Sequence, residues 1–297
     1  SIKNVVFQII ENADTAILAL QNGEVDAYQM TPQQVKKLDL DASNLTAYSY
    51  TEGRVGYLQI NCNRVTDENV RKALLFAMDR KAMDDAAFES DEYYSIPYTF
   101  LPTNSQFYTE DGVEKYEQDV DKAKSMLEEA GVSGLKLKLG YISSDAVQSA
   151  QALLIQEQLK EVGVTVELAG GDGTAIANAM KDPDNEYDMY LGGYIMGIDP
   201  DTFSSLFEND GAYNYMHYSG YDTIDQLFEE GRSELDESAR KETYAKLQAA
   251  VQDTGAFYPI ISNNKILVVN NRIQGVEDAG LVPVYTFEDT SSLKIAE

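Results

Sequence analysis

The stretch from residue 135 to residue 168, LKLKLGYISSDAVQSAQALLIQEQLKEVGVTVEL, decides the fold class. Residues 135–139 alternate between apolar and charged side chains, which is typical of a half-buried strand. Asp145 is a residue type that begins helices and Gly163 one that ends them. Residues 164–168 then return to a pattern rich in β-branched side chains. The stretch therefore predicts a strand, a long helix and a second strand.

The alternation continues on both sides of this stretch. Upstream, Asp119 and Gly131 are the expected ends of another helix. Downstream, a short helix over 176–180 leads to a strand over 187–195. Strands that alternate with helices in this way predict an α/β layer with right-handed crossovers.

The two ends of the chain predict further elements. A β-type run at 5–10 precedes a helix that we expect to be capped by Asp14, and a strand over 25–28 follows, close to parallel with the first. Thr31 and Pro32 begin a capping-box helix. The remaining expectations are a strand at 55–61, a helix beginning at Asp67, an ordered loop region over 85–118, helices around 224–231 and from Asp236, and strands at 258–261 and 265–270.

Composition excludes several classes of function. The 297 residues carry a net charge of −27, which disfavours binding to nucleic acid. One cysteine, Cys62, excludes an internal disulfide framework, and one histidine, His217, excludes a multi-histidine metal centre. No apolar run approaches the roughly 18–20 residues that span a bilayer. Because the chain begins at Ser1 with no signal peptide before its first expected strand, we expect a part of a longer protein.

Six separated blocks, in this order, resemble the extracellular solute-binding proteins of ABC importers, of the large oligopeptide- and dipeptide-binding type. The blocks are 20–26 (LQNGEVD), 57–61 (YLQIN), 70–80 (VRKALLFAMDR), 123–131 (AKSMLEEAG), 187–201 (which holds Tyr187-Asp188 and Asp199-Pro200-Asp201) and 214–222 (which ends in Tyr221-Asp222). They extend over nearly the whole chain, and they match roughly the C-terminal half to three-fifths of such a protein.

The resemblance implies a fold and a division of the chain. The expected fold is an α/β, type II-like periplasmic-binding-protein lobe with a mixed sheet flanked by helices, truncated at the N-terminus. Residues 1–57 would be the late part of a first lobe, residues 58–255 a second, ligand-covering lobe, and residues 256–297 a return to the first lobe.

The resemblance also implies a function without catalysis. The protein would capture oligopeptides in an interlobe cleft and deliver them to the transmembrane subunits of an ABC permease. It would lie on the extracellular side of the cytoplasmic membrane, either lipid-anchored or periplasmic, as a monomer that needs no cofactor.

Candidate ligand-binding residues follow from the same resemblance. In relatives, the end of the strand at 187–195 offers backbone hydrogen bonds to the bound peptide. The expected contacts are Gly192, Gly193, Tyr194, Ile195, Met196, Asp199, Asn214, His217 and Tyr218. For the glycines the other interpretation is a bend in a core strand, and for the segment 213–218 it is packing beneath the next helix.

One departure from the family pattern concerns ligand charge. Peptide-binding relatives commonly carry an Asp that pairs with the ligand α-amino group, where this chain has Met196 or Gly197. Asp199 could substitute, although an Asp before Pro is also a common turn residue. Blocked peptides, or other solutes such as an oligosaccharide or a metal chelate, therefore remain alternatives to peptides with a free N-terminus.

Two further classes of function stay open. The fold could serve as a peptide sensor without a transporter. A carboxylate-dependent cleft hydrolase is a more distant alternative, because among 50 acidic residues close pairs arise by chance and no spacing singles one out. His217 alone is a weak metal signal, and Cys62 is interpreted as a buried, inert thiol.

Overall fold

A computed structural model describes residues 2–10, 12–88, 93–195, 199–282 and 286–296. The chain divides into two compact units. We call Ser1–Glu52 with Asn263–Glu297 the small unit and Gly53–Ser262 the large unit. One long strand, β8 (Phe257–Asn270), contributes residues to both.

The small unit is built on antiparallel pairs. Strands β1 (Ala27–Met30) and β2 (Leu45–Thr51) both pair with the later part of β8. Its other elements are α1 (Ala13–Gln21), α2 (Pro32–Val35), β9 (Ile273–Gln274), β10 (Leu281–Val282), β11 (Thr286–Phe287), η3 (Thr290–Ser292) and β12 (Lys294–Ile295).

Three expectations for this unit were wrong in detail. Residues 5–10 form no strand, because no strand of the described chain pairs with them, and Val5, Val6, Phe7 and Ile9 are mostly exposed. Helix α1 is capped by Asn12, whose side chain accepts the Thr15 amide, and not by Asp14. The strand expected at 25–28 is β1, and its pairing with β8 is antiparallel. The capping box at Thr31 is confirmed.

The large unit contains a mixed sheet. The strand order of this sheet is β8–β3–β7–β5–β6. Strand β3 (Arg54–Ile60) is antiparallel to both of its neighbours, β8 and β7. Strand β5 (Lys136–Ile142) is parallel to both of its neighbours, β7 and β6. The other strands are β7 (Met189–Ile195), β6 (Thr165–Gly171) and the short β4 (Tyr94–Ser95). The β-α-β-α-β order predicted from residues 119–195 is thereby confirmed.

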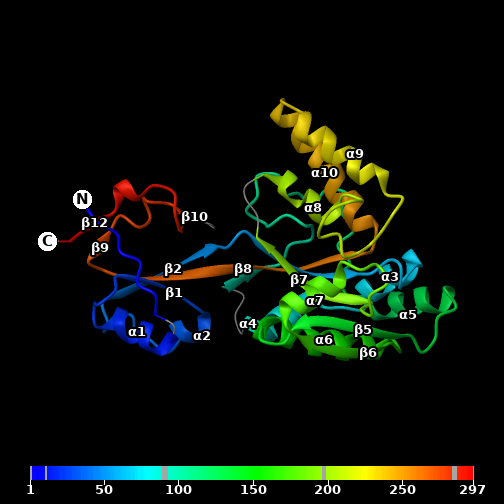
Figure 1. The fold of residues 1–297 in the computed structure, drawn as a ribbon, viewed down its shortest axis with the longest axis horizontal. Coiled ribbons are helices and arrows are strands. Elements are labelled where there is room, and N and C mark those ends of the chain that lie inside the picture. Colours follow the sequence, from blue (N-terminus) through cyan, green and yellow to red (C-terminus); the bar gives the residue numbers. More distant parts are fainter. Residues whose placement is uncertain (1, 11, 89–92, 196–198, 283–285, 297) are drawn as a thin grey trace. The chain divides into compact units, whose positions relative to one another are not determined.

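The helices of the large unit begin mostly where the sequence predicts. Asp67, Asp119, Asp145 and Asp236 each cap a helix with a side-chain oxygen. The helices are α3 (Glu68–Phe76), α4 (Arg80–Phe88), α5 (Val120–Glu129), α6 (Ala146–Glu161), α7 (Gly173–Met180), η2 (Pro200–Phe203), α8 (Ser204–Phe207), α9 (Asp222–Ser233) and α10 (Glu237–Asp253). Figure 1 shows α6 along β5 and β6, and α9 beside α10.

Two apolar clusters bury the two faces of this sheet. Leu58 and Leu191 belong to a cluster that includes side chains from α3, α4, α5 and α6. Val55 and Tyr57, whose side chains point to the other face, belong to a cluster with residues of α8, α9 and α10. Because β3 and β7 are covered on both sides over most of their length, their open ends are the places where a ligand could reach the backbone.

Candidate functional site

The carboxyl end of β7 carries four of the predicted site residues. Strand β7 pairs with β3 along its whole length, from Ile60 opposite Met189 to Arg54 opposite Ile195. Its first four residues are buried, whereas Gly193 and Ile195 are exposed and Tyr194 is partly exposed. The strand therefore runs from the core to the surface within seven residues.

Both glycines of β7 make room for a side chain of β3. A Cβ atom on Gly192 would lie 2.6 Å from Cε2 of Tyr57, and one on Gly193 would lie 2.0 Å from Nη2 of Arg54. Neighbouring residues of a strand face opposite sides of the sheet, so the two side chains cover opposite faces. Within the structure, the groups that lie closest to these glycines are the Tyr57 ring and the Arg54 guanidinium.

Tyrosine side chains surround the end of β7 on the Tyr57 side. The Tyr194 ring lies 5.7 Å from Phe203 and 6.2 Å from Tyr213, and its hydroxyl is 3.2 Å from Oγ of Ser205. The Tyr213 ring in turn lies 6.3 Å from the Tyr215 ring, and 44% of Tyr213 is exposed. The result is a partly open, uncharged aromatic surface that can pack against apolar or aromatic groups.

Asp199 is held within the protein. It caps η2 by accepting the Asp201 amide, and both its oxygens accept from Nη2 of Arg240 at 2.8–2.9 Å. Partial burial acts to raise the pKa of Asp199, but the bonds from Arg240 and Asp201 outweigh burial and lower it. The carboxylate is thus ionised and already carries a cationic partner.

Three other predicted residues anchor the segment before α9. Asn214 donates to the Glu208 carbonyl, and Nε2 of His217 lies 2.8 Å from the Met180 carbonyl oxygen. Tyr218 is buried, its hydroxyl donates to the Phe207 carbonyl, and burial raises its pKa well above the ordinary value. Met196, the remaining predicted residue, lies outside the described residues.

Arg54 is a residue that the sequence argument did not single out. It lies directly opposite Ile195, and its guanidinium group covers Gly193. Only the register between β3 and β7 brings these residues together. The signal in the sequence is faint: an arginine directly before the strand predicted at 55–61, in a very acidic chain.

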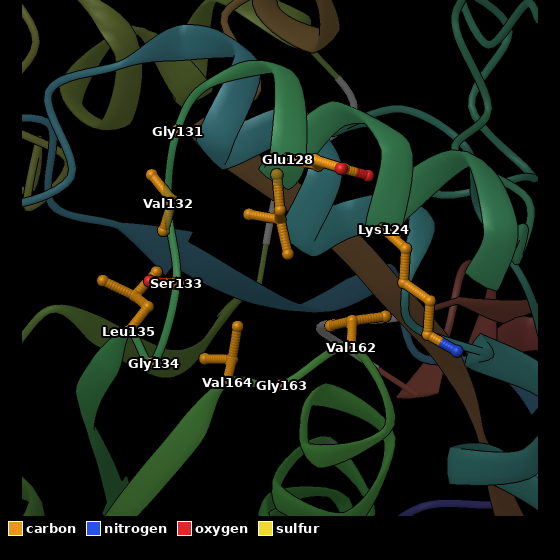
Figure 2. Close-up of a pocket in the computed structure, with 11 residues that line it drawn as sticks. Lys124, Glu128, Gly131, Val132, Ser133, Gly134, Leu135, Val162, Gly163 and Val164 are labelled. Atoms are coloured by element: carbon orange, nitrogen blue, oxygen red, sulfur yellow. The ribbon is translucent and has the colours of Figure 1, made fainter.

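A separate cavity of about 370 Å³ lies away from this strand end. Figure 2 shows that its lining comes from α5 and from the turns that lead into β5 and β6. Lys124 and Glu128 supply its charged side chains, and Val132, Val162 and Val164 are among its apolar ones. The cavity contains none of the predicted site residues.

The described residues include neither a membrane-spanning helix nor a cluster of metal-binding side chains. No helix in the described ranges is both long and apolar enough to cross a membrane. Across the same ranges, no three or more His, Cys, Asp or Glu side chains form a group that could hold a metal ion. Cys62 is half-buried, and burial raises the pKa of its thiol to about 11, as expected for an unreactive cysteine.

Comparison with known proteins identifies the class. Residues 1–215 match the sequence model of the bacterial extracellular solute-binding proteins, family 5 (middle). The chain therefore belongs to this family, as the six blocks indicated, and the related proteins are substrate-binding transport components.

Individual relatives are similar to this chain in sequence or structure over most of its length. CtaP of Listeria monocytogenes, an ABC transporter substrate-binding protein, is 38% identical with a TM-score of 0.91, over 98% of this chain and 60% of its own. AppA of Clostridium difficile is 32% identical with a TM-score of 0.88, over 97% and 60%. The oligopeptide-binding protein AppA of Bacillus subtilis is 26% identical, over 90% of this chain and 52% of its own.

These likenesses settle the fold class. The predicted α/β fold of the type II periplasmic-binding-protein kind, with a mixed sheet flanked by helices, is confirmed. The chain spans 52–60% of the length of the three relatives named above.

Proposed function

We propose that this chain is the peptide-contacting part of the substrate-binding component of an ABC importer, and that it has no catalytic role. The observation that carries the proposal is an open strand edge. Pairing of β7 with β5 ends at Tyr190, whereas pairing with β3 continues to Ile195. On the β5 side, residues 191–195 thus have no strand partner in the described chain.

An unpaired strand edge can bind an extended peptide by strand addition. Its free N–H and C=O groups offer hydrogen bonds to any peptide backbone, and side-chain specificity comes from the walls beside it. Here one wall is the aromatic surface of Tyr194 and Tyr213. Such a site favours peptides over solutes that lack a repeating amide backbone.

The whole protein would use this site as relatives of the family do. We infer that the large unit belongs to the ligand-covering lobe, that the small unit belongs to the first lobe, and that peptide is captured between lobes. The loaded protein would deliver peptide to a permease on the extracellular side of the cytoplasmic membrane, as a lipid-anchored or periplasmic monomer. Closure over the ligand would be the state that the permease recognises.

Native mass spectrometry of the gently purified, full-length natural protein tests the proposal. We expect a ladder of bound masses that match short peptides, since backbone bonding tolerates many side chains. A single non-peptide mass would overturn the peptide assignment. Turnover of an added peptide would overturn the non-enzymatic one.

A further inference from the structure

The chain holds seven arginines, and Arg54 differs from the other six. Arg64, Arg232, Arg240 and Arg272 form ion pairs, and Arg71 and Arg80 donate to backbone carbonyls. Within the described ranges, the side chain of Arg54 makes no hydrogen bond or ion pair. An arginine side chain has five N–H donors, and no residue that the structure describes accepts from those of Arg54.

The surface beneath the guanidinium group fixes its place. Gly56 and Gly193 are directly opposite each other on β3 and β7. A Cβ atom on Gly193 would lie 2.0 Å from Nη2 of Arg54, and one on Gly56 would lie 3.4 Å from Nη1 and 2.8 Å from Cγ2 of Ile261. The planar group therefore lies along a pair of glycines that lack the side chains that would displace it.

The charge around Arg54 points to an anion that comes from outside. The chain has 50 acidic residues, yet none of the described ones pairs with this cation. At the same strand end, Asp199 already has Arg240 as its partner, so an incoming amine finds no free partner in that carboxylate. A guanidinium fork binds a carboxylate through two parallel N–H···O bonds.

We propose that Arg54 binds a carboxylate of the ligand and so selects peptides that carry one beside the open edge of β7. The inference rests on the proposed function and deepens it, because it names the anionic group that the site requires. The carboxylate belongs either to the peptide C-terminus or to an acidic side chain.

Titration calorimetry on the full-length natural protein tests this assignment. One peptide is compared in three forms: with a free C-terminus, with an amidated C-terminus, and amidated with a Glu in its sequence. The wild type should bind at least one carboxylate-bearing form about tenfold or more tightly than the neutral form. The form that gains affinity identifies the source of the carboxylate.

The matched variants are Arg54→Met and Lys160→Met, which remove the same charge from two places in the large unit. Arg54→Met should abolish the preference for the carboxylate-bearing peptide, so that its acidic and neutral forms bind with equal affinity. Lys160→Met should leave both affinities unchanged. Arg54→Lys should recover part of the preference, because it restores the charge without the fork.

The outcomes separate the two proposals. The role of Arg54 is overturned, while peptide binding stands, if the Arg54→Met variant keeps the carboxylate preference. The same holds if the variant binds the neutral and acidic peptides more weakly by the same factor. If no form of the peptide binds the wild type, the proposed function fails and the inference fails with it.

Discussion

Asp84 is a fully buried acid between α4 and α6. One of its oxygens is 3.4 Å from Nε2 of Gln151, and the other has no partner in the described chain. Burial raises the pKa of Asp84 from 3.8 to about 8, against the lowering effects of Gln151 and of the Arg80 charge. The folded protein therefore keeps a proton that the unfolded chain loses near pH 4.

This difference predicts a pH effect on stability. Between the two pKa values the folded state binds more protons than the unfolded state, so the contribution of Asp84 falls as pH rises from about 4 to about 8. Asp84→Asn should remove that slope, which is at most about 1.4 kcal/mol per pH unit. Urea unfolding at about pH 5 and about pH 7.5 measures it, and parallel profiles for variant and wild type would contradict it.

Gly192 and Gly193 predict unequal responses to the same substitution. Gly192→Ala places a Cβ atom 2.6 Å from Tyr57, whose buried ring packs 4.7 Å from Phe257 and has little room to move. We expect a loss of about 1–3 kcal/mol in the free energy of unfolding. Gly193→Ala meets only the half-buried side chain of Arg54, which can swing away, so it should cost less.

A third glycine supplies the control for this pair. At Gly171 a Cβ atom would make an ordinary contact of 3.4 Å with Ile176, so Gly171→Ala should be close to neutral. Urea denaturation of the three variants gives the comparison. A Gly192→Ala variant as stable as Gly171→Ala would contradict the expectation, because it would show that the Tyr57 ring can move aside at little cost in free energy.

At the scale of elements, α6 depends on a local signal. The Asp145 carboxylate accepts from the amides of both Val147 and Gln148 at 2.9 and 3.1 Å. Asp145→Ala should lower the free energy of unfolding by about 1 kcal/mol, because two amides at the helix start lose their partner. Ser144→Ala is the matched control, since Ser144 is exposed and makes no side-chain hydrogen bond with a described residue. Equal chemical denaturation midpoints for the two variants would show that the Asp145 cap contributes nothing to stability.

Local signals of this kind explain which elements the sequence predicts well. Asp145 and Gly163 bound α6 because a cap and a left-handed glycine act within one turn of the helix. The run at 5–10 has strand-like residues, but a strand also needs a partner, and partners are set far away in the sequence. The antiparallel pairing of β1 with β8 joins residues about 240 apart, which no local pattern encodes.

The candidate site also depends on contacts between distant parts of the sequence, which no local pattern predicts. The sequence singles out Gly192 and Gly193 as candidate ligand contacts, but the side chains that cover them, those of Tyr57 and Arg54, come from β3. Their identity depends on the register of β3 with β7. The ion pair that occupies Asp199 joins it to Arg240 in α10, and it too is a product of tertiary packing.

For the whole molecule, the net charge of −27 should influence how ligands arrive. Charges of one sign attract oppositely charged solutes over roughly a Debye length, about 10 Å at 0.1 M salt. A lysine-containing peptide should therefore associate faster than a neutral one at low ionic strength, and the advantage should shrink as salt is added. Stopped-flow binding at two salt concentrations measures both rates, and equal salt dependence for the two peptides would contradict this expectation.

The central claim is that peptide adds to the open edge of β7, and amide hydrogen exchange tests it most directly. In the full-length natural protein, a bound peptide should slow exchange within residues 191–195, at the amides that do not face β3. Strand β6 serves as the internal reference and should change little. A peptide that binds tightly while exchange at 191–195 stays the same would contradict the account.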